Sequence, residues 1–175
     1  MLPVDARDHE GRTPLAVAAE HRSLRVARKL VELGANCHTT DLAGRSILNT
    51  AVRVAENEAM IALMLGDPQT DVNLTDNDGV TPLMACMETE DIKMVRALLA
   101  FKADANIQEH GTGRTALHRS VLRNWLDGVD VLLGPAAGGA HTPIHFSPQP
   151  HPLLSPKPTI VSHESTHVEL NSGGV

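Results

Sequence analysis

The sequence predicts an all-α solenoid in which short helix–turn–helix units stack side by side. One phrase occurs four times, as GRTPL at residues 11–15, GRSIL at 44–48, GVTPL at 79–83 and GRTAL at 113–117. The glycines that open the phrases are 33, 35 and 34 residues apart (11 to 44, 44 to 79 and 79 to 113), and such a period indicates a repeat architecture. Aromatic residues make up only 2% of the chain, so the core must come from small and aliphatic side chains, which pack helices closely.

The first helix of each unit is expected to begin just after a hydroxyl residue of the phrase. These residues are Thr13, Ser46, Thr81 and Thr115, whose side-chain oxygens can accept a hydrogen bond from a backbone N–H that the helix leaves unpaired. Pro14 and Pro82 follow at the position where a missing N–H costs nothing. In the first unit the pattern predicts a helix over residues 14–20.

The second helix of the first unit is expected over residues 24–33, where apolar residues recur at helical spacing. Gly34 would end it in the left-handed conformation, and residues 36–44 would form a projecting hairpin. Lys102 stands where a glycine would end the corresponding helix of the third unit, which predicts a strained backbone there. Residues 66–70 carry two extra positions and are expected to form a longer loop.

Taken together, these positions resemble the ankyrin-repeat family over residues 4–134. The resemblance implies an ankyrin-repeat solenoid of four stacked units with projecting β-hairpin loops, in which each unit buries its apolar face only against its neighbours. Ala16, Asn49 and Met84 replace the histidine of the family's Thr-Pro-Leu-His phrase, which survives only as His118. We therefore expect three units to lack the side-chain hydrogen bond of that histidine. Neither end carries an obvious polar capping unit, so either the ends fray or the chain is a piece, or a shortened product, of a longer array.

The composition changes at residue 135, which predicts a repeat domain over residues 1–134 and a disordered Pro/His/Ser-rich tail over 135–175. Seven of the eleven prolines and five of the ten histidines lie in this tail. His163, Glu164 and His167 match the H-E-x-x-H pattern of zinc hydrolases. Because nothing around them supports the helix that this chemistry needs, a zinc hydrolase is only a remote alternative.

The charge and cysteine content narrow the possible functions and the compartment of the protein. A net charge of −6 supplies no basic field for nucleic acid, and no apolar run approaches the ~18 residues of a membrane span. Two cysteines cannot form a disulfide framework, which favours a reducing compartment, the cytoplasm or the nucleus. We expect Cys86 to be buried and Cys37 to lie at a hairpin. No catalytic, cofactor or metal constellation emerges, so we expect no enzyme.

The ankyrin resemblance implies a monomer that binds a protein partner on the concave side, through its hairpin tips and first helices. Arg12, Arg45 and Arg114 would form a basic row along that side, able to bind carboxylates or phosphates of the partner; alternatively, such charges only solvate an exposed edge. The candidate contacts are Arg12, Leu42, Arg45, Arg53, Asn77, Asp78, Glu88, His110, Arg114 and Arg119.

A narrower resemblance concerns the fourth unit. Its sequence over residues 103–118 is similar to a repeat of the inhibitor-of-κB family, which implies regulation of a Rel-type transcription factor. The chain lacks that family's acidic tail and its N-terminal double-serine signal. Two hypotheses of protein binding therefore stand, an adaptor or scaffold and an inhibitor-of-κB-like regulator.

Overall fold

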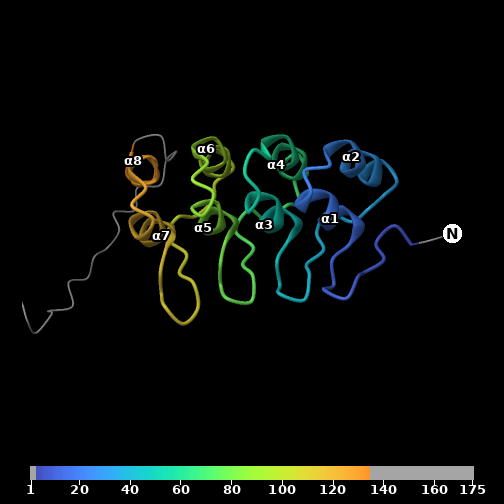
Figure 1. Cartoon of the computed structure of the whole chain (residues 1–175), viewed down its shortest axis with the longest axis horizontal. Helices are drawn as coiled ribbons and strands as arrows, with labels where there is room; N and C mark the ends of the chain where they lie inside the picture. The colour runs from blue at the N-terminus through green and yellow to red at the C-terminus, as the bar shows by residue number, and fades with distance from the viewer. Residues whose placement is uncertain (1–2, 135–175) are drawn as a thin grey trace, which may run out of the picture. The chain divides into compact units, whose positions relative to one another are not determined.

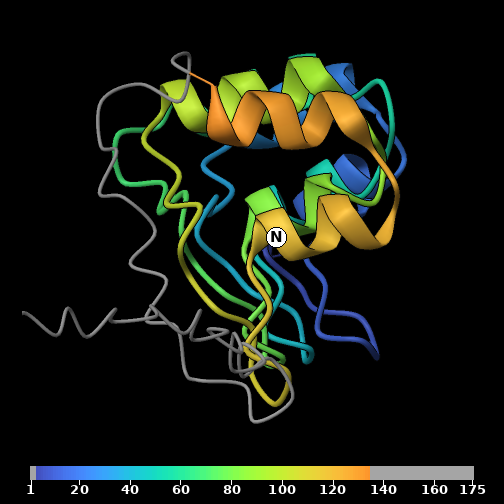
Figure 2. The ribbon, with the colours of Figure 1, turned by 90° about the vertical axis from the view of Figure 1, so that its left-hand side faces the viewer.

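The computed structural model describes residues 3–134, which form four stacked helix pairs. The helices are α1 (Pro14–Glu20), α2 (Leu24–Glu32), α3 (Ile47–Val52), α4 (Glu58–Leu65), α5 (Pro82–Cys86), α6 (Ile92–Ala100), α7 (Ala116–Leu122) and α8 (Leu126–Leu133). The first helices of the pairs lie in one row and the second helices in another (Figure 1). A view along the stack shows all four loops projecting beyond the row of first helices (Figure 2). The predicted ankyrin-repeat solenoid is confirmed, whereas the predicted tail lies outside the described residues.

The helix starts follow the predicted hydroxyl caps in three of the four units. Each hydroxyl oxygen accepts a hydrogen bond from the backbone N–H three residues later. The distance is 3.3 Å for Thr13, 3.0 Å for Ser46 and 3.2 Å for Thr81. In the fourth unit the backbone N–H of Thr115 instead donates to His118 Nδ1 at 3.3 Å, and Thr115 Oγ1 lies 3.0 Å from the same nitrogen. His118 therefore has the structural role of a capping residue.

The predicted helix ends are also found. Helix α2 ends at Glu32, one residue earlier than expected, and Gly34 follows with φ +85°. Lys102 adopts φ +68°, so the predicted strain at this position is confirmed. In the longer loop, Thr70 Oγ1 donates to the carbonyl of Met64 at 2.7 Å.

Methionine fills much of the interior, which explains how a core forms with so few aromatic residues. The methionines at 60, 64, 84, 87 and 94 are at most 1% exposed. Thioether side chains are flexible and fill irregular gaps between helices. Cys86 is fully buried among them, as predicted.

Asn49 forms a hydrogen bond that compensates for one of the replaced histidines. Its Nδ2 donates to the carbonyl of Val80 at 2.9 Å, from the second unit to the third. Asn57 Nδ2 similarly donates to the carbonyl of Ala19 at 3.0 Å. The expected loss of the histidine's own hydrogen bond stands, and the amide of Asn49 forms a different one that reaches the next unit.

The outer face of the last helix pair leaves apolar side chains exposed within the described part of the chain. Val121 is 62% exposed, whereas its counterparts Ala19, Val52 and Met87 are fully buried. The helices α1, α3 and α5 each contact the first helix of the following unit, and no described unit follows α8. Among the helices of residues 3–134, none combines the length and apolar character needed to cross a membrane.

Candidate partner-binding surface

The four projecting loops are joined at their tips by backbone hydrogen bonds. The N–H of Leu42 donates to the carbonyl of Glu10 at 2.9 Å, that of Asn77 to Ala43 at 3.0 Å, and that of His110 to Asp78 at 2.7 Å. We call the loop residues 8–12, 41–45, 76–80 and 109–114 the tip ridge. The ridge brings together the candidate contacts Leu42, Asn77, Asp78 and His110, as the sequence predicts. Leu42 is 72% exposed on it.

An acidic side chain at the base of each loop fixes the loop's shape. Asp41 Oδ1 accepts the backbone N–H groups of residues 43 and 45, both at 2.9 Å. Asp76 Oδ1 accepts those of residues 78 and 80 at 3.1 and 2.9 Å, and Asp8 accepts two in the same way. In the fourth loop, Thr112 Oγ1 donates to Glu109 Oε1 instead. These acids recur in the sequence at the repeat period, which was the signal for their role.

The predicted arginine row is largely neutralised by carboxylates of the same chain. Arg45 lies 2.7 Å from Asp41, and Arg12 lies 2.8 Å from Asp8 and 2.9 Å from Glu20. Hydrogen bonds from Arg12, chiefly from its backbone N–H and also from its side chain, lower the pKa of Asp8. Most of these guanidinium groups are thus held in place by hydrogen bonds rather than left as a free basic field.

Arginines and carboxylates also pair with one another at and just beyond the ends of the first helices. Arg53 lies 3.1 Å from Asp76 and 3.5 Å from Glu88. Arg119 donates from Nη1 to Glu88 at 2.7 Å, and from Nε to Glu109 at 3.0 Å. The candidate contacts Arg53, Glu88 and Arg119 therefore form one connected network.

Glu109 is the buried acid of this network, with 8% of its surface exposed. Burial alone would raise the pKa of its carboxyl, but hydrogen bonds from Thr112 and Arg119 outweigh that effect and lower it. The carboxylate is consequently ionised and holds both the loop and the α7 arginine.

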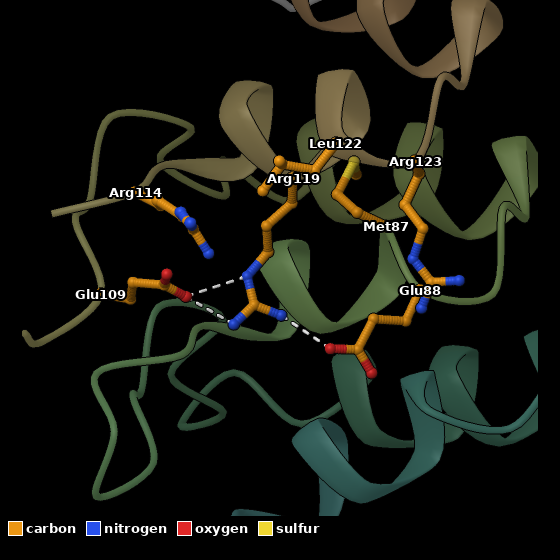
Figure 3. Close-up of a pocket in the computed structure, with 7 residues that line it drawn as sticks. All are labelled: Met87, Glu88, Glu109, Arg114, Arg119, Leu122 and Arg123. Carbon is orange, nitrogen blue, oxygen red and sulfur yellow. Dashed lines mark hydrogen bonds and ion pairs between the residues drawn. The ribbon is translucent and has the colours of Figure 1, made fainter. Parts of the chain in front are cut away.

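A groove of about 290 Å³ lies on this side of the stack at the fourth unit. We call it the fourth-unit groove. Its lining residues are Met87, Glu88, Glu109, Arg114, Arg119, Leu122 and Arg123. In Figure 3, Arg114 and Arg123 lie to either side of Arg119, with Glu109 on the side of Arg114 and Glu88 on the side of Arg123.

Four groove residues were not among the predicted contacts, namely Met87, Glu109, Leu122 and Arg123. Leu122 stands at the repeat position that Glu20, Arg53 and Glu88 occupy in the other units. It is 63% exposed. An apolar residue at a position that is otherwise charged was the signal that could have revealed the groove.

The cysteines and the remaining acids and histidines form no reactive or metal-binding cluster in residues 3–134. Burial raises the pKa of the Cys86 thiol to about 12, and it also raises that of half-buried Cys37. No group of three or more potential ligands that could hold a metal ion occurs in this part of the chain. The His163–Glu164–His167 pattern lies outside the described residues.

Comparison with protein families matches residues 10–42 to the ankyrin repeat and residues 48–142 to a model of several ankyrin repeats. The second match runs beyond the predicted domain boundary at residue 134. Ankyrin repeats are generally protein-interaction modules, and the family is typically non-catalytic.

Similar proteins are themselves diverse. The chain is 29% identical to human Rabankyrin-5 over 153 residues, which are 83% of the chain and 13% of that protein. It is 39% identical to human neurogenic locus notch homolog protein 4 over 94 residues, or 54% of the chain and 5% of that protein. It is 29% identical to mouse NF-kappa-B inhibitor delta over 151 residues, or 75% of the chain and 46% of that protein. The chain thus spans less than half the length of each of these relatives.

Proposed function

We infer that this chain, which belongs to the ankyrin-repeat family, binds a partner protein on its tip ridge and the adjoining first helices. The observation that carries the proposal is the set of backbone hydrogen bonds that join neighbouring loop tips. A surface that is already ordered loses little conformational entropy when a partner binds.

The fixed side chains support the same function. Arg45, Arg53 and Arg119 are held by carboxylates and keep guanidinium edges at the surface, and arginine is enriched at protein interfaces. Leu42 adds an exposed apolar contact at a loop tip. In this proposal the chain acts as an adaptor or scaffold in the cytoplasm or nucleus, as a monomer and without catalysis.

A matched pair of triple variants tests the proposal. The ridge variant carries Leu42→Lys, Asp78→Lys and Arg114→Glu, side chains with no hydrogen bond or ion pair to other residues in 3–134. The control variant carries Ala62→Lys, Asp130→Lys and Arg96→Glu, which are exposed on the second helices and give the same change in net charge.

We expect proteins captured from cell lysate by the wild-type chain to be captured by the control variant and lost with the ridge variant. Circular dichroism should show equal helix content in all three. If the control variant loses the partners and the ridge variant keeps them, the proposed surface is wrong.

A second candidate is regulation of a Rel-type transcription factor, in the manner that the name of NF-kappa-B inhibitor delta states for that protein. Its support is the alignment over 75% of this chain and the similarity of the fourth unit to that family. Binding of a purified Rel-homology dimer would be measured by biolayer interferometry. A dissociation constant below about 1 μM that rises with the ridge variant is expected if this candidate is correct. Absence of binding at tens of micromolar would leave the adaptor function alone.

A further inference from the structure

The fourth-unit groove differs in charge from the rest of the tip ridge. It contains three guanidinium groups but only two carboxylates, those of Glu88 and Glu109. Arg119 engages both carboxylates, through Nη1 to Glu88 and through Nε and Nη2 to Glu109. Arg114 and Arg123 form no ion pair with any residue in 3–134.

The corresponding arginines of the other units are already paired. Arg114 corresponds to Arg12 and Arg45 in the repeat, and both of these contact the acid at the base of their own loop. In the fourth unit Glu109 is occupied by Thr112 and Arg119 instead, because the longer side chain of Glu turns toward α7. Arg114 is therefore left exposed with donors that no described carboxylate accepts.

An apolar surface lies between the two unpaired arginines. Leu122 is 63% exposed in the groove, and the buried Met87 lines it beside Leu122. Exposed apolar side chains rimmed by charged groups are typical of interaction sites. At about 290 Å³ the groove is at the small end for an enclosed ligand site, and it suits side chains of a bound segment.

We propose that the fourth-unit groove binds an acidic segment of the partner protein, in which a bulky apolar side chain covers Leu122 and flanking Asp or Glu carboxylates reach Arg114 and Arg123. Carboxylates are the ligands that the neighbouring arginine already binds in this groove, and the planar guanidinium group matches their geometry. Because the chain itself is acidic, with a net charge of −6, attraction of an acidic segment depends on this local excess of arginine. The inference rests on the proposed function and names the chemistry of the partner.

The experiment is selection of binders from a phage-displayed library of random 12-residue peptides on the immobilised full chain. Soluble peptides from the selection are then measured by fluorescence anisotropy. The groove variant is Arg114→Gln with Arg123→Gln, and its control is Arg25→Gln with Arg28→Gln on the exposed side of α2. Both variants remove two positive charges.

We expect enriched peptides to combine Asp or Glu with Leu, Ile, Phe or Trp. Their affinity should fall at least about tenfold with the groove variant, which corresponds to about 1.4 kcal/mol. It should be unchanged with the control variant, and changing the peptide acids to Asn or Gln should cause a similar loss. A variant with Leu122→Ser should also weaken binding while leaving the helix content unchanged.

Other outcomes separate this inference from the proposed function. Peptides that keep their affinity for the groove variant but lose it with Leu42→Lys and Asp78→Lys would overturn the inference and leave the proposed function standing. Peptides that bind only outside the ridge would overturn both. Peptides that bind at least tenfold tighter when phosphoserine replaces the acids would overturn the assignment of the groove to carboxylates.

Discussion

Arg119 donates from Nε to Glu109 at 3.0 Å and from Nη1 to Glu88 at 2.7 Å, so one guanidinium group joins the fourth loop, α7 and the end of α5. The pKa of Glu109 is lowered, because the hydrogen bonds from Thr112 and Arg119 outweigh the effect of burial. Protonation of this carboxyl therefore lowers the free energy of unfolding.

The pH dependence of stability should reveal this group. Since the folded pKa lies below the ordinary value of 4.5, the stabilisation is complete above about pH 4.5 and is lost as the pH falls through the folded pKa. We expect Glu109→Gln to lower the free energy of unfolding at pH 7 by about 1–3 kcal/mol. The difference from the wild type should shrink below pH 4.5. Urea unfolding between pH 3 and 7 measures both, with the exposed Glu90→Gln as control; a difference that is independent of pH would contradict the assignment.

Asn49 is expected to couple the second and third units. Its Nδ2 donates to the carbonyl of Val80 at 2.9 Å in the interior, whereas Asn49 Oδ1 has no partner among residues 3–134. Asn49→Ala should cost about 0.5–1.5 kcal/mol, because it removes a buried hydrogen bond between units, although the carbonyl of Val80 keeps the one from the N–H of Asp76. Chemical denaturation measures this cost, and Asn106→Ala, which removes an exposed hydrogen bond to Asp104, should change stability by less than about 0.5 kcal/mol. Equal effects of the two changes would exclude the coupling.

Lys102 is expected to be a site where glycine stabilises the protein. A side chain at φ +68° costs about 1–2 kcal/mol, and glycine removes that strain but adds about 0.5–1 kcal/mol of entropy cost. Lys102→Gly should therefore raise the free energy of unfolding by about 0.5–1 kcal/mol, as measured by thermal or urea unfolding. Lys102→Ala keeps the Cβ and serves as the control. If Lys102→Gly is no more stable than Lys102→Ala, the position is not strained.

The exposed Val121 of α7 should tolerate a substitution that the corresponding residue of the third unit, Met87, cannot. Met87 is fully buried against the fourth unit, whereas Val121, one repeat later, is 62% exposed. Met87→Ala should cost about 2–5 kcal/mol through the lost contacts and the cavity, and Val121→Ala less than about 0.5 kcal/mol. Denaturation of the full chain tests both; a large loss with Val121→Ala would mean that this face is covered in solution.

The repeating phrase made most of the fold predictable. Thr13, Ser46 and Thr81 cap helices as expected, and Gly34 follows its helix in the left-handed conformation, because these are local effects that the residue type determines. Lys102 adopts the same conformation against its own preference, because its position in the repeat requires it. Charge pairing was not predictable in the same way. The expected basic row of Arg12, Arg45 and Arg114 is mostly paired, since it depends on how carboxylates from neighbouring units approach.

The fourth-unit groove was only partly predictable. Leu122 differs from the charged residues at its repeat position, but nothing in the sequence distinguishes Arg123, and the groove itself arises because the third and fourth units place these residues beside Met87 and Arg114. Asn49 is a similar case, because its hydrogen bond partner lies in the following unit. In a stacked architecture, local signals predict each unit and contacts between units determine the surface.

Site-specific photo-crosslinking of the full chain in cells would show which surface contacts the partner protein. A photoreactive phenylalanine derivative would replace Leu42, Asp78 or His110 on the tip ridge, and Ala62, Arg96 or Asp130 on the second helices, all of which are exposed. We expect the ridge positions to crosslink to the same partner protein and the second-helix positions not to do so. Crosslinks to a partner that arise only from the second-helix positions would mean that the tip ridge is not the binding surface.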